Sequence, residues 1–597
     1  MNAVQCFALL DDASAADPQH ARSRLYTGHA GTLLCSDVAH WPQLLDDMQA
    51  ALARGLFAVS VLSYELGGQL LGVDAHAPTG PLAQFLLFDT CTHLSPPEVA
   101  AWLAARGDAP AGIAGIHANV DQAEFTRAIG RIHDYIEAGH TYQVNYTYRL
   151  RFDAFGSLFA LYARLRARQP VPYGALVALP DGGALLSLSP ELFVRHTGGE
   201  LLTRPMKGTA PAADDDEENA RRADALAHDT KNRAENLMIV DLLRNDLGRI
   251  AVTGTVDVPA LFDVQRYSSV LQMTSTVRAQ MRPDATLAEV FRALYPCGSI
   301  TGAPKRRTME IIRELEPAAR GVYTGAIGWF DPTGDFCLSV PIRTLSLQAP
   351  VDGVRRGEMG VGAGIVFDSD AADEYAECQL KARFLTGLEN AFEIFETMHA
   401  TRAQGCRHRE LHLARMAASS SYFGFSFDGD AARAALDSAC AALGDGDFRL
   451  RLSLGHGQPF SIQAAPVAPL AEPVRLVLAG AVTQADDLFL RHKTSIRTRY
   501  DAAWRDAEAQ GAFDALFFNE RGELTEGGRS NVFVKLDGRW CTPPLACGVL
   551  PGIMRAVVLA DPAWNACERV VTRAMLAGAE GLMVCNALRG ALPATLC

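Results

Sequence analysis

The sequence predicts an α+β protein with more than one domain, and three observations support this. The chain has 597 residues, too many for a single hydrophobic core, and this length corresponds to about three or four structural units. Short apolar runs of β character, such as 56–62, are interspersed with amphipathic helical stretches, such as 42–54. The pattern restarts after Asn390, where the motifs discussed below also change. We therefore predict two domains, at 1–388 and 389–597.

The elements of the first domain follow one another in a mixed order. One helix, at 231–247, shows an apolar stripe that we assign to Leu237, Val240, Leu243 and Leu247. Further helices are expected at 42–54, 122–138 and 371–389, and strands at 56–62, 143–152, 173–196, 322–330, 335–348 and 358–367.

Composition excludes several classes of protein. The net charge of −13 and the isoelectric point near 5.6 argue against a nucleic-acid-binding protein. The 13 cysteines are scattered without a CxxC pair, which is typical of reduced thiols rather than of a disulfide framework or a zinc site. No apolar run reaches the roughly 18 residues that cross a bilayer. We therefore expect a cytoplasmic protein that holds anionic substrates by local charges and does not contact membranes.

Two residues point to covalent chemistry. Lys207 lies in the strand-like run 201–209, and Glu191 follows an apolar strand that ends at Ser189. An amine that attacks and an acid that protonates a leaving group are the components of a substitution at an unactivated hydroxyl. Alone, a lysine before Gly208 is most often a solvated turn residue. The interpretation therefore depends on the motifs that follow along the chain.

A second group of residues suits a divalent metal and an anionic substrate. Glu374 and Glu377 share a helix face at i,i+3 spacing, and together with Glu235 they offer the carboxylates that Mg²⁺ prefers. Arg343 and Lys381 are cations suited to a substrate carboxylate. An isolated pair such as Glu377 and Lys381 is more often a surface ion pair, so these residues carry weight only together.

Several segments occur in a fixed order, at 189–191, 204–209, 229–249, 298–305, 341–344, 362–366 and 373–381. Over about 115–385 they resemble the chorismate-utilising enzyme family, whose fold combines antiparallel sheets with flanking helices. The resemblance implies that Glu191 is the general acid toward the C4 hydroxyl of chorismate. It implies Mg²⁺ ligands at Glu235 and Glu377, with Glu374 assisting through water. Substrate carboxylates would be bound by Arg343, Lys381, Gly362, Gly364, Ser299 and Thr301.

Two positions select a reaction within this family. Isochorismate and salicylate synthases have a lysine base at the position of Gln143, and anthranilate synthases have alanine at the position of Lys207. A lysine there resembles aminodeoxychorismate synthase component I, in which it attacks C2 of chorismate. Amination at C4 with retention requires two displacements, so a covalent adduct precedes ammonia. Two departures from the family pattern are Gln272, where histidine is frequent, and Cys297, where glycine is usual.

The last 200 residues contain groups suited to pyridoxal 5′-phosphate (PLP). This cofactor requires a lysine, an acid that faces its pyridine nitrogen and a cup for its phosphate. Lys493 and Glu526 supply the first two, and the turn at Gly552, Ile553 and Met554 begins a predicted helix whose N-terminus suits a phosphate. A solvated lysine beside a charged β-hairpin is the alternative interpretation of the same residues.

The order of these segments resembles the fold-type IV PLP enzymes, a two-layer α+β family of aminotransferases and 4-amino-4-deoxychorismate lyase. The resemblance implies that Lys493 bears PLP, that Arg415 and Ile553 hold its phosphate, and that Glu526 pairs with its ring nitrogen. Met554 and the segment 585–588 are more similar to the lyase than to the aminotransferases.

Together the two resemblances imply one chain that makes 4-aminobenzoate and pyruvate from chorismate and ammonia, toward folate. Mg²⁺ and PLP are the expected cofactors. No Gly-x-Cys-x-Gly nucleophile turn is present, so a separate glutamine amidotransferase subunit is the expected ammonia source. Three alternatives remain open: an aminobenzoate-derived secondary metabolite as the end product, an aminotransferase at the C-terminus, or a catalytically inactive docking domain there.

Overall fold

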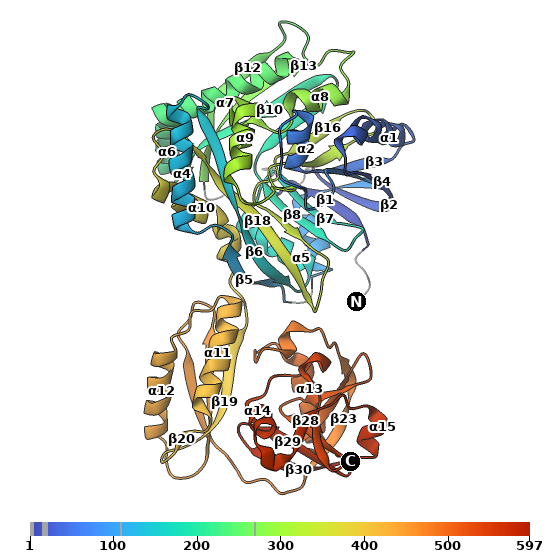
Figure 1. Cartoon of the computed structure of the whole chain (residues 1–597), viewed down its shortest axis with the longest axis vertical. Coiled ribbons are helices and arrows are strands. Elements are labelled where there is room, and N and C mark those ends of the chain that lie inside the picture. The colour runs from blue at the N-terminus through green and yellow to red at the C-terminus, as the bar shows by residue number, and fades with distance from the viewer. Residues whose placement is uncertain (1–4, 15–21, 108–109, 268–269) are drawn as a thin grey trace. The chain divides into compact units, whose positions relative to one another are not determined.

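The computed structural model describes residues 5–14, 22–107, 110–267 and 270–597. The chain divides into two compact units (Figure 1). Unit 1 comprises most of the chain up to Leu388. Unit 2 comprises Glu389–Cys597 together with two short segments, Gly112–Gly115 and Pro350–Val354.

Unit 1 is built on an 18-stranded sheet whose described pairs are antiparallel. Because each strand pairs with its neighbour, the order can be followed from one edge to the other. It runs β14 (Gly302–Ala303), β6 (Gln143–Phe155), β18 (Val354–Ile365), β17 (Thr344–Leu347), β8 (Ala184–Ser189), β7 (Tyr173–Ala178), β1 (Phe7–Asp11), β2 (Ser23–Cys35), β4 (Ala83–Leu94), β3 (Phe57–Leu62), β15 (Ala326–Phe330), β16 (Phe336–Ser339), β9 (Leu192–Thr197), β10 (Glu200–Arg204) and β13 (Val270–Gln280). Strand β13 also pairs with β11 (Met206–Pro211) and β12 (Asp257–Tyr267), and β5 (Gly112–Ala118) belongs to the same sheet.

Helices flank this sheet (Figure 1). The helices predicted at 42–54, 122–138, 231–247 and 371–389 are confirmed as α1, α4, α7 and α10. The strands predicted at 56–62, 143–152, 322–330 and 358–367 are confirmed with shifted ends, whereas 173–196 forms three strands (β7, β8 and β9) and 335–348 forms two (β16 and β17). Capping explains one start clearly: Asp121 and Glu124 form a reciprocal capping box on α4. The helices are α1 (Trp41–Ala53), α2 (Tyr64–Leu70), α3 (Pro96–Ala104), α4 (Gln122–Glu137), α5 (Leu158–Arg168), α6 (Asp216–His228), α7 (Thr230–Gly248), α8 (Leu287–Leu294), α9 (Lys305–Leu315) and α10 (Ala371–Thr386).

The buried face of α7 differs from the predicted stripe at one position. Val240, Leu243 and Leu247 are buried as expected, but Leu237 is 43% exposed. At 100° per residue, Leu237 lies about 120° from Leu243 around the helix. The stripe includes Asn236 and Ile239 instead. This difference in the buried face matters because it sets the direction in which Glu235, on the same helix, projects.

Aromatic side chains fill much of the core of unit 1. Trp41 of α1 meets Phe291 of α8 edge to face at 5.1 Å, and Phe85 of β4 meets Phe330 of β15 in the same way at 5.6 Å. Such edge-to-face pairs add about 0.5–1.5 kcal/mol each beyond the area they bury. They fix helices α1 and α8 on the sheet face that also packs against α7.

A buried network of charges ties a key loop to the sheet. Arg320 donates to both carboxylate oxygens of Glu316, at 2.7 and 3.1 Å, and both residues are 3% exposed. The same guanidinium donates to the backbone oxygens of Ile300 (2.9 Å) and Asn145 (2.6 Å). Ile300 lies in the 3₁₀ turn η2 (Gly298–Ile300) and Asn145 in β6. Arg320 therefore holds this loop against the first strands of the sheet.

Unit 2 contains two sheets. The smaller has four strands in the order β20 (Gly405–Cys406), β19 (Glu393–Thr401), β21 (Phe448–Gly455) and β22 (Ser461–Pro466), and carries α11 (Arg409–Phe423) and α12 (Gly429–Ala441). The larger runs β25 (Leu524–Gly527), β24 (Asp514–Asn519), β23 (Val474–Thr483), β30 (Gly590–Leu596), β29 (Gly581–Asn586), β26 (Asn531–Leu536), β27 (Arg539–Thr542) and β28 (Ala566–Glu568). Its helices are α13 (Thr498–Ala509), α14 (Ile553–Ala560) and α15 (Arg573–Ala577).

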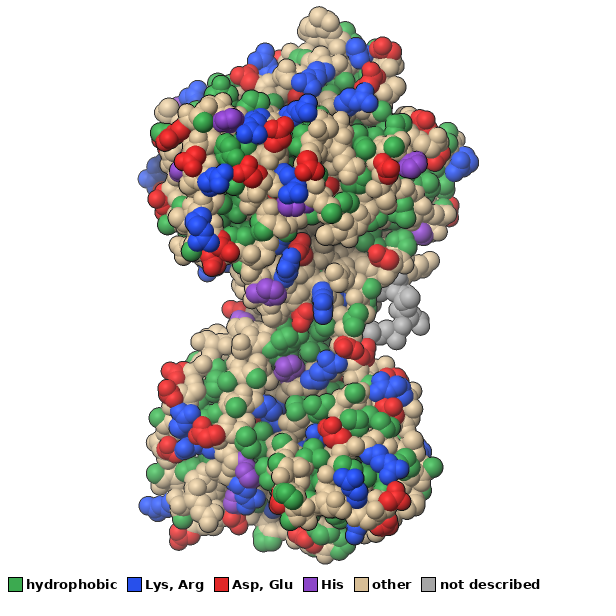
Figure 2. All heavy atoms as spheres, viewed as in Figure 1, with side chains coloured by type: hydrophobic (Ala, Val, Ile, Leu, Met, Phe, Trp, Pro, Cys, Tyr) green, Lys and Arg blue, Asp and Glu red, His purple; other side chains and the backbone are tan. Residues whose placement is uncertain are grey.

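The surface is that of an ordinary mixed-charge protein. On the face shown in Figure 2, acidic and basic side chains are interspersed over both units. Among the described residues, no helix is both long enough and apolar enough to span a membrane.

The buried network yields a stability prediction. Glu316→Ala leaves the Arg320 guanidinium buried without its carboxylate, which is expected to destabilise unit 1 by about 3–5 kcal/mol. The matched control is Glu314→Ala, which removes an exposed ion pair with Arg131 and is expected to cost less than about 1 kcal/mol. Chemical denaturation of both variants measures the difference. Equal losses would contradict a structural role for the network.

Candidate active sites

Lys207 is turned into unit 1 by a break between two strands. Strand β10 ends at Arg204 and β11 begins at Met206, and the register against β13 shifts between Met206 and Thr209. At Gly364, a Cβ atom would lie 2.8 Å from the Lys207 amine and 2.7 Å from Nε2 of Gln143. The side chains of Lys207 and Gln143 therefore both end against Gly364.

Glu191 follows β8 and is 5% exposed. The Ser299 hydroxyl donates to Oε1 of Glu191 at 2.6 Å. The backbone N–H of Glu191 donates to the Ser189 hydroxyl at 3.2 Å. Burial raises the pKa of Glu191 to about 7, although the Ser299 hydrogen bond and the charge of Lys207 both act to lower it. The carboxyl group therefore holds its proton for much of the time at neutral pH.

Charges from three elements act on Lys207. Burial lowers the pKa of Lys207, and the positive charge of Lys381 acts in the same direction. Glu235 of α7, Glu377 of α10 and Glu191, which follows β8, oppose this lowering of the pKa. The structure thus brings the predicted nucleophile, the predicted acid and two predicted metal ligands into one electrostatic neighbourhood.

Two of the three carboxylates predicted to bind Mg²⁺ are engaged by protein groups. Glu377 pairs with Lys381 at 2.8 Å, and Glu374 accepts from the Ser369 hydroxyl at 2.7 Å. Among the described residues, no group of three His, Cys, Asp or Glu side chains is arranged closely enough to hold a metal ion. The donor set still suits Mg²⁺, because Glu235 and Glu377 both act on Lys207 and Glu374 acts on Glu377.

The residues predicted to bind substrate carboxylates differ in whether their side chains already have partners within the protein. Arg343 adopts a left-handed backbone (φ 53°), and burial lowers its pKa to about 10. Its side chain forms no hydrogen bond or ion pair with the other described residues, which suits an anion. Lys381 instead donates to the Gly362 carbonyl at 3.0 Å. Thr301 donates to the carbonyls of its own loop, at Gly298 and Cys297.

Gly362 is required by packing. A Cβ there would lie 2.3 Å from the carbonyl oxygen of Tyr146 on the neighbouring strand β6. The close approach of β18 to β6 thus explains this glycine, and its predicted contact with a substrate carboxylate remains a prediction.

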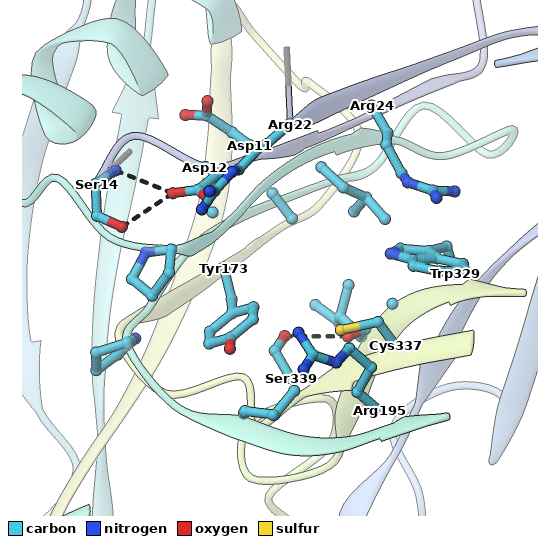
Figure 3. Close-up of a pocket in the computed structure, with 18 of the residues that line it drawn as sticks. Asp11, Asp12, Ser14, Arg22, Arg24, Tyr173, Arg195, Trp329, Cys337 and Ser339 are labelled. Carbon is cyan, nitrogen blue, oxygen red and sulfur yellow. Dashed lines mark hydrogen bonds and ion pairs between the residues drawn. The ribbon is translucent and has the colours of Figure 1, made fainter. Parts of the chain in front are cut away.

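A separate cavity of about 650 Å³ lies on the other side of the strand end that carries Glu191. Pro190 and Leu192 line it, whereas Glu191 does not, because successive side chains point to opposite faces. Figure 3 shows Arg24 directed at the Trp329 ring, with its guanidinium carbon 3.6 Å from the ring centroid. The residues predicted to be catalytic are not among those that line this cavity.

Unit 2 contains a cavity of about 320 Å³ around Lys493. Lys493 is held beside β19, where its carbonyl accepts from the Phe395 N–H at 3.0 Å, and its amine lies 4.9 Å from the Phe395 ring centroid. Burial lowers the pKa of Lys493 to about 7, and Arg415 and Arg497 act in the same direction. A large fraction of this amine is therefore neutral at neutral pH, as attack on an aldehyde requires.

Arg415 is held in place by a carboxylate that sequence reasoning missed. Glu396 accepts two hydrogen bonds from Arg415, at 2.8 and 2.6 Å, and one from His412 at 2.6 Å. Burial alone would raise the pKa of Glu396, but Arg415 and His412 outweigh it and hold the pKa at about 2. Arg415 also donates to the Pro551 carbonyl at 2.9 Å, next to the turn at Ile553. The sequence signal that could have revealed this clamp was an acidic residue, Glu396, at an inward-facing position of β19.

Glu526 lies on β25 and is held by three donors. The Tyr500 hydroxyl donates to Oε1 at 2.9 Å, and the Asn531 amide and the Leu550 N–H donate to Oε2 at 2.9 and 3.0 Å. Burial raises the pKa of Glu526 to about 7 despite these bonds. A cationic pyridine nitrogen would favour its ionised form.

The cavity around Lys493 fits PLP. Lys493, Arg415, Glu526, Ile553 and Met554 all line it, and α14 begins at Ile553 directly after Gly552. The cavity thus presents a partly neutral lysine, a buried acid, and a helix N-terminus beside an arginine, which are the groups that this cofactor requires.

Comparison with known proteins agrees with both sites. A family model described as chorismate binding enzyme matches residues 12–387, and one described as amino-transferase class IV matches residues 393–597. The chain belongs to the chorismate binding enzyme family. Its C-terminal part is a class IV aminotransferase domain, and the predicted α+β fold class is thereby confirmed.

Relatives of two activities match this member of the chorismate binding enzyme family. Aminodeoxychorismate synthase component 1 of Klebsiella aerogenes is 42% identical over 276 residues, 46% of this chain and 59% of that protein. Anthranilate synthase component 1 of Streptomyces coelicolor is 40% identical over 290 residues, which are 48% of this chain and 56% of that protein. The chain therefore matches a little over half the length of these curated relatives.

The fold of a solved relative supports the same assignment. The crystal structure of anthranilate synthase component I from Streptococcus pneumoniae superposes with a TM-score of 0.52 at 25% identity. The match covers 60% of this chain and 91% of that one.

The cofactor site yields a direct prediction. Purified protein incubated with PLP is expected to show absorbance near roughly 410–420 nm, typical of a protonated Schiff base, which borohydride abolishes. Lys493→Ala removes the amine and should lack this band, whereas Lys535→Ala, outside the cavity, should retain it. A borohydride-sensitive band of unchanged intensity in Lys493→Ala would contradict the assignment.

Proposed function

We propose that this chain converts chorismate and ammonia to 4-aminobenzoate and pyruvate. Residues 1–388 aminate C4 to give 4-amino-4-deoxychorismate, and residues 389–597 release pyruvate from it. The observation that carries the proposal is the pairing of a partly buried lysine, Lys207, with a buried acid, Glu191, of raised pKa. The similarity to aminodeoxychorismate synthase component 1 supports the first half and the class IV domain supports the second.

The first step is a displacement by Lys207. Its neutral amine attacks C2 of chorismate, both double bonds of the ring diene shift by one position toward C4, and the C4–O bond breaks. Glu191 gives its proton to the departing hydroxyl, which leaves as water. The buried environment favours this exchange, because burial favours the neutral forms of both groups before reaction.

The second step replaces Lys207 with ammonia. Ammonia attacks C4, both double bonds shift back, and the C2–N bond to Lys207 breaks as the amine takes up a proton. Two successive displacements place the new amine on the face from which the hydroxyl left. Gln143, which lies beside Lys207, is not a base, so water is not activated at this position.

The substrate is a dicarboxylate, and the surrounding residues suit it. Mg²⁺, bound by Glu235, Glu377 and, through water, Glu374, would neutralise one carboxylate and orient the ring. Arg343 has no acidic partner in the part of the chain that the structure describes, and it would bind the other carboxylate. Lys381, the backbone N–H of Ser299, Thr301 and the backbone of Gly362 and Gly364 complete the proposed set.

The second reaction takes place around Lys493. Bound PLP supplies an electron sink for the C4 carbanion. Arg415 and the N–H of Ile553 would hold its phosphate beside Met554, and Glu526 would pair with its ring nitrogen. Lys493 then takes the proton from C4, pyruvate leaves from C3, and the ring becomes aromatic.

The ammonia source is a separate glutamine amidotransferase subunit, for which free ammonia substitutes. Because the two reactions share one chain, the intermediate is produced at a raised effective concentration for the second site. The product is an aromatic amino acid suited to folate synthesis in the cytoplasm.

The products of single-site variants test this proposal. Wild-type protein with chorismate, Mg²⁺, ammonium and PLP should yield 4-aminobenzoate and pyruvate by mass spectrometry. Lys207→Ala should lose C4 amination, because no amine remains to form the adduct. Lys493→Ala should accumulate aminodeoxychorismate. Lys535→Ala serves as control.

Several outcomes would redirect the assignment. Native turnover by Lys207→Ala would exclude the covalent route. Anthranilate or isochorismate as product would exclude the proposed reaction of unit 1. Aminodeoxychorismate without pyruvate from the wild-type chain would indicate an aminotransferase or an inactive C-terminal domain.

The pH dependence of amination follows from the two pKa shifts. Glu191 must be protonated, so kcat/KM should fall as the pH rises past about 7. Lys207 must be neutral, so kcat/KM should also fall at low pH. Glu191→Gln is expected to lower kcat/KM by about 10²–10⁴ and to remove the basic limb. Persistence of that limb in the variant would contradict the role of Glu191.

A further inference from the structure

Cys297 is linked to the predicted acid, Glu191, by two successive hydrogen bonds through Ser299. Its sulfur is 3.2 Å from the Ser299 hydroxyl oxygen, and that hydroxyl donates to Oε1 of Glu191 at 2.6 Å. The three residues are 3%, 6% and 5% exposed, so solvent does not compete for these bonds. A thiol, a hydroxyl and a carboxyl group therefore form a buried chain.

The direction of each bond in this chain follows from counting protons. A serine hydroxyl has one proton and two lone pairs. Ser299 gives its proton to Glu191, so toward the sulfur it is an acceptor. Burial raises the pKa of the Cys297 thiol to about 12, so the S–H donor is present throughout the neutral range. The order is thiol to hydroxyl to carboxyl.

This order has a consequence for the acid. Oε1 of Glu191 already accepts a proton from Ser299, so the carboxyl proton resides on Oε2. If the thiol were absent, the Ser299 hydroxyl would gain rotational freedom and its bond to Oε1 would weaken.

We propose that Cys297 is a positioning residue: its S–H orients the Ser299 hydroxyl toward Oε1 of Glu191 and so presents the acid proton on Oε2. The inference rests on the proposed role of Glu191 as the general acid in C4 amination. Cys297 does not touch the reacting atoms in this scheme.

Few other charged groups lie near this row of hydrogen bonds, and their influence on Glu191 can be separated from that of the Cys297 thiol. Lys207 of β11 acts on Glu191, and Lys305 of α9 acts on Cys297. Lys305 is paired with Asp246 of α7 at 2.6 Å. None of these three is altered by a substitution at Cys297, so a shift in the titration of Glu191 reports on the thiol.

The test is the pH profile of kcat/KM for ammonia-dependent amination by the full chain. In Cys297→Ala the weakened hydrogen bond stabilises the Glu191 carboxylate less, so the basic limb should move up by about 0.5 pH unit. In Cys297→Ser a hydroxyl donor replaces the thiol, and the limb should return to within about 0.2 unit of wild type. Cys35→Ala, which removes another buried thiol of unit 1, should leave the limb in place.

Three results would overturn the proposal. An unmoved limb in Cys297→Ala would show that the thiol does not orient Ser299. An equal shift in Cys297→Ser and Cys297→Ala would indicate a packing effect. Absence of C4 amination by the wild-type chain would remove the proposed function, and the inference with it, and is recognised before any variant is made.

Discussion

The ion pair between Arg320 and Glu316 is the constraint on which the geometry of unit 1 depends. Two buried charges cost several kcal/mol of desolvation each, and only close pairing with further hydrogen bonds offsets this. Here the remaining donors of Arg320 go to Ile300 and Asn145. The charge pair thus fixes the loop after α8 against β6. Ser299, in the same turn, reaches Glu191 because that loop is fixed.

Desolvation then sets the protonation of both sites. In each unit a lysine and a glutamate are buried near one another but do not form a direct ion pair. Burial lowers the pKa of Lys207 and Lys493 and raises that of Glu191 and Glu526 to about 7. In unit 1, a neutral lysine and a protonated acid are the forms that the proposed attack and proton donation require. In unit 2, a neutral lysine suits attack on the PLP aldehyde, whereas a cationic pyridine nitrogen would ionise Glu526. The same physical effect thus prepares two different reactions on two unrelated sheets.

The two units differ in how they hold anions. In unit 2, Glu396 orients Arg415 through a bidentate pair, so the guanidinium has a fixed direction. In unit 1, Arg343 has a strained backbone and no partner among the described residues. A paired arginine suits a permanently bound phosphate, and an unpaired one suits a substrate that comes and goes.

Local features were predictable from the sequence and long-range pairings were not. Helices such as α4 and α7 follow from the periodicity of their apolar residues. Lys207 and Glu191 were selected as candidates from short sequence motifs. The orientation of α7 was wrong at Leu237, because periodicity alone does not determine which side of a wide apolar face meets the sheet. The clamp on Arg415 was missed, because Glu396 lies 19 residues earlier on another element.

In the proposed mechanism, Lys207 becomes covalently attached to the substrate. The most direct measurement is peptide mapping by mass spectrometry after acid quench of the protein with chorismate and Mg²⁺, without ammonia. The peptide that contains Lys207 is expected to carry the mass of chorismate less water, and the corresponding peptide of Lys207→Ala is expected to be unmodified. An unmodified Lys207 in protein that aminates chorismate at C4 once ammonia is added would contradict the covalent mechanism.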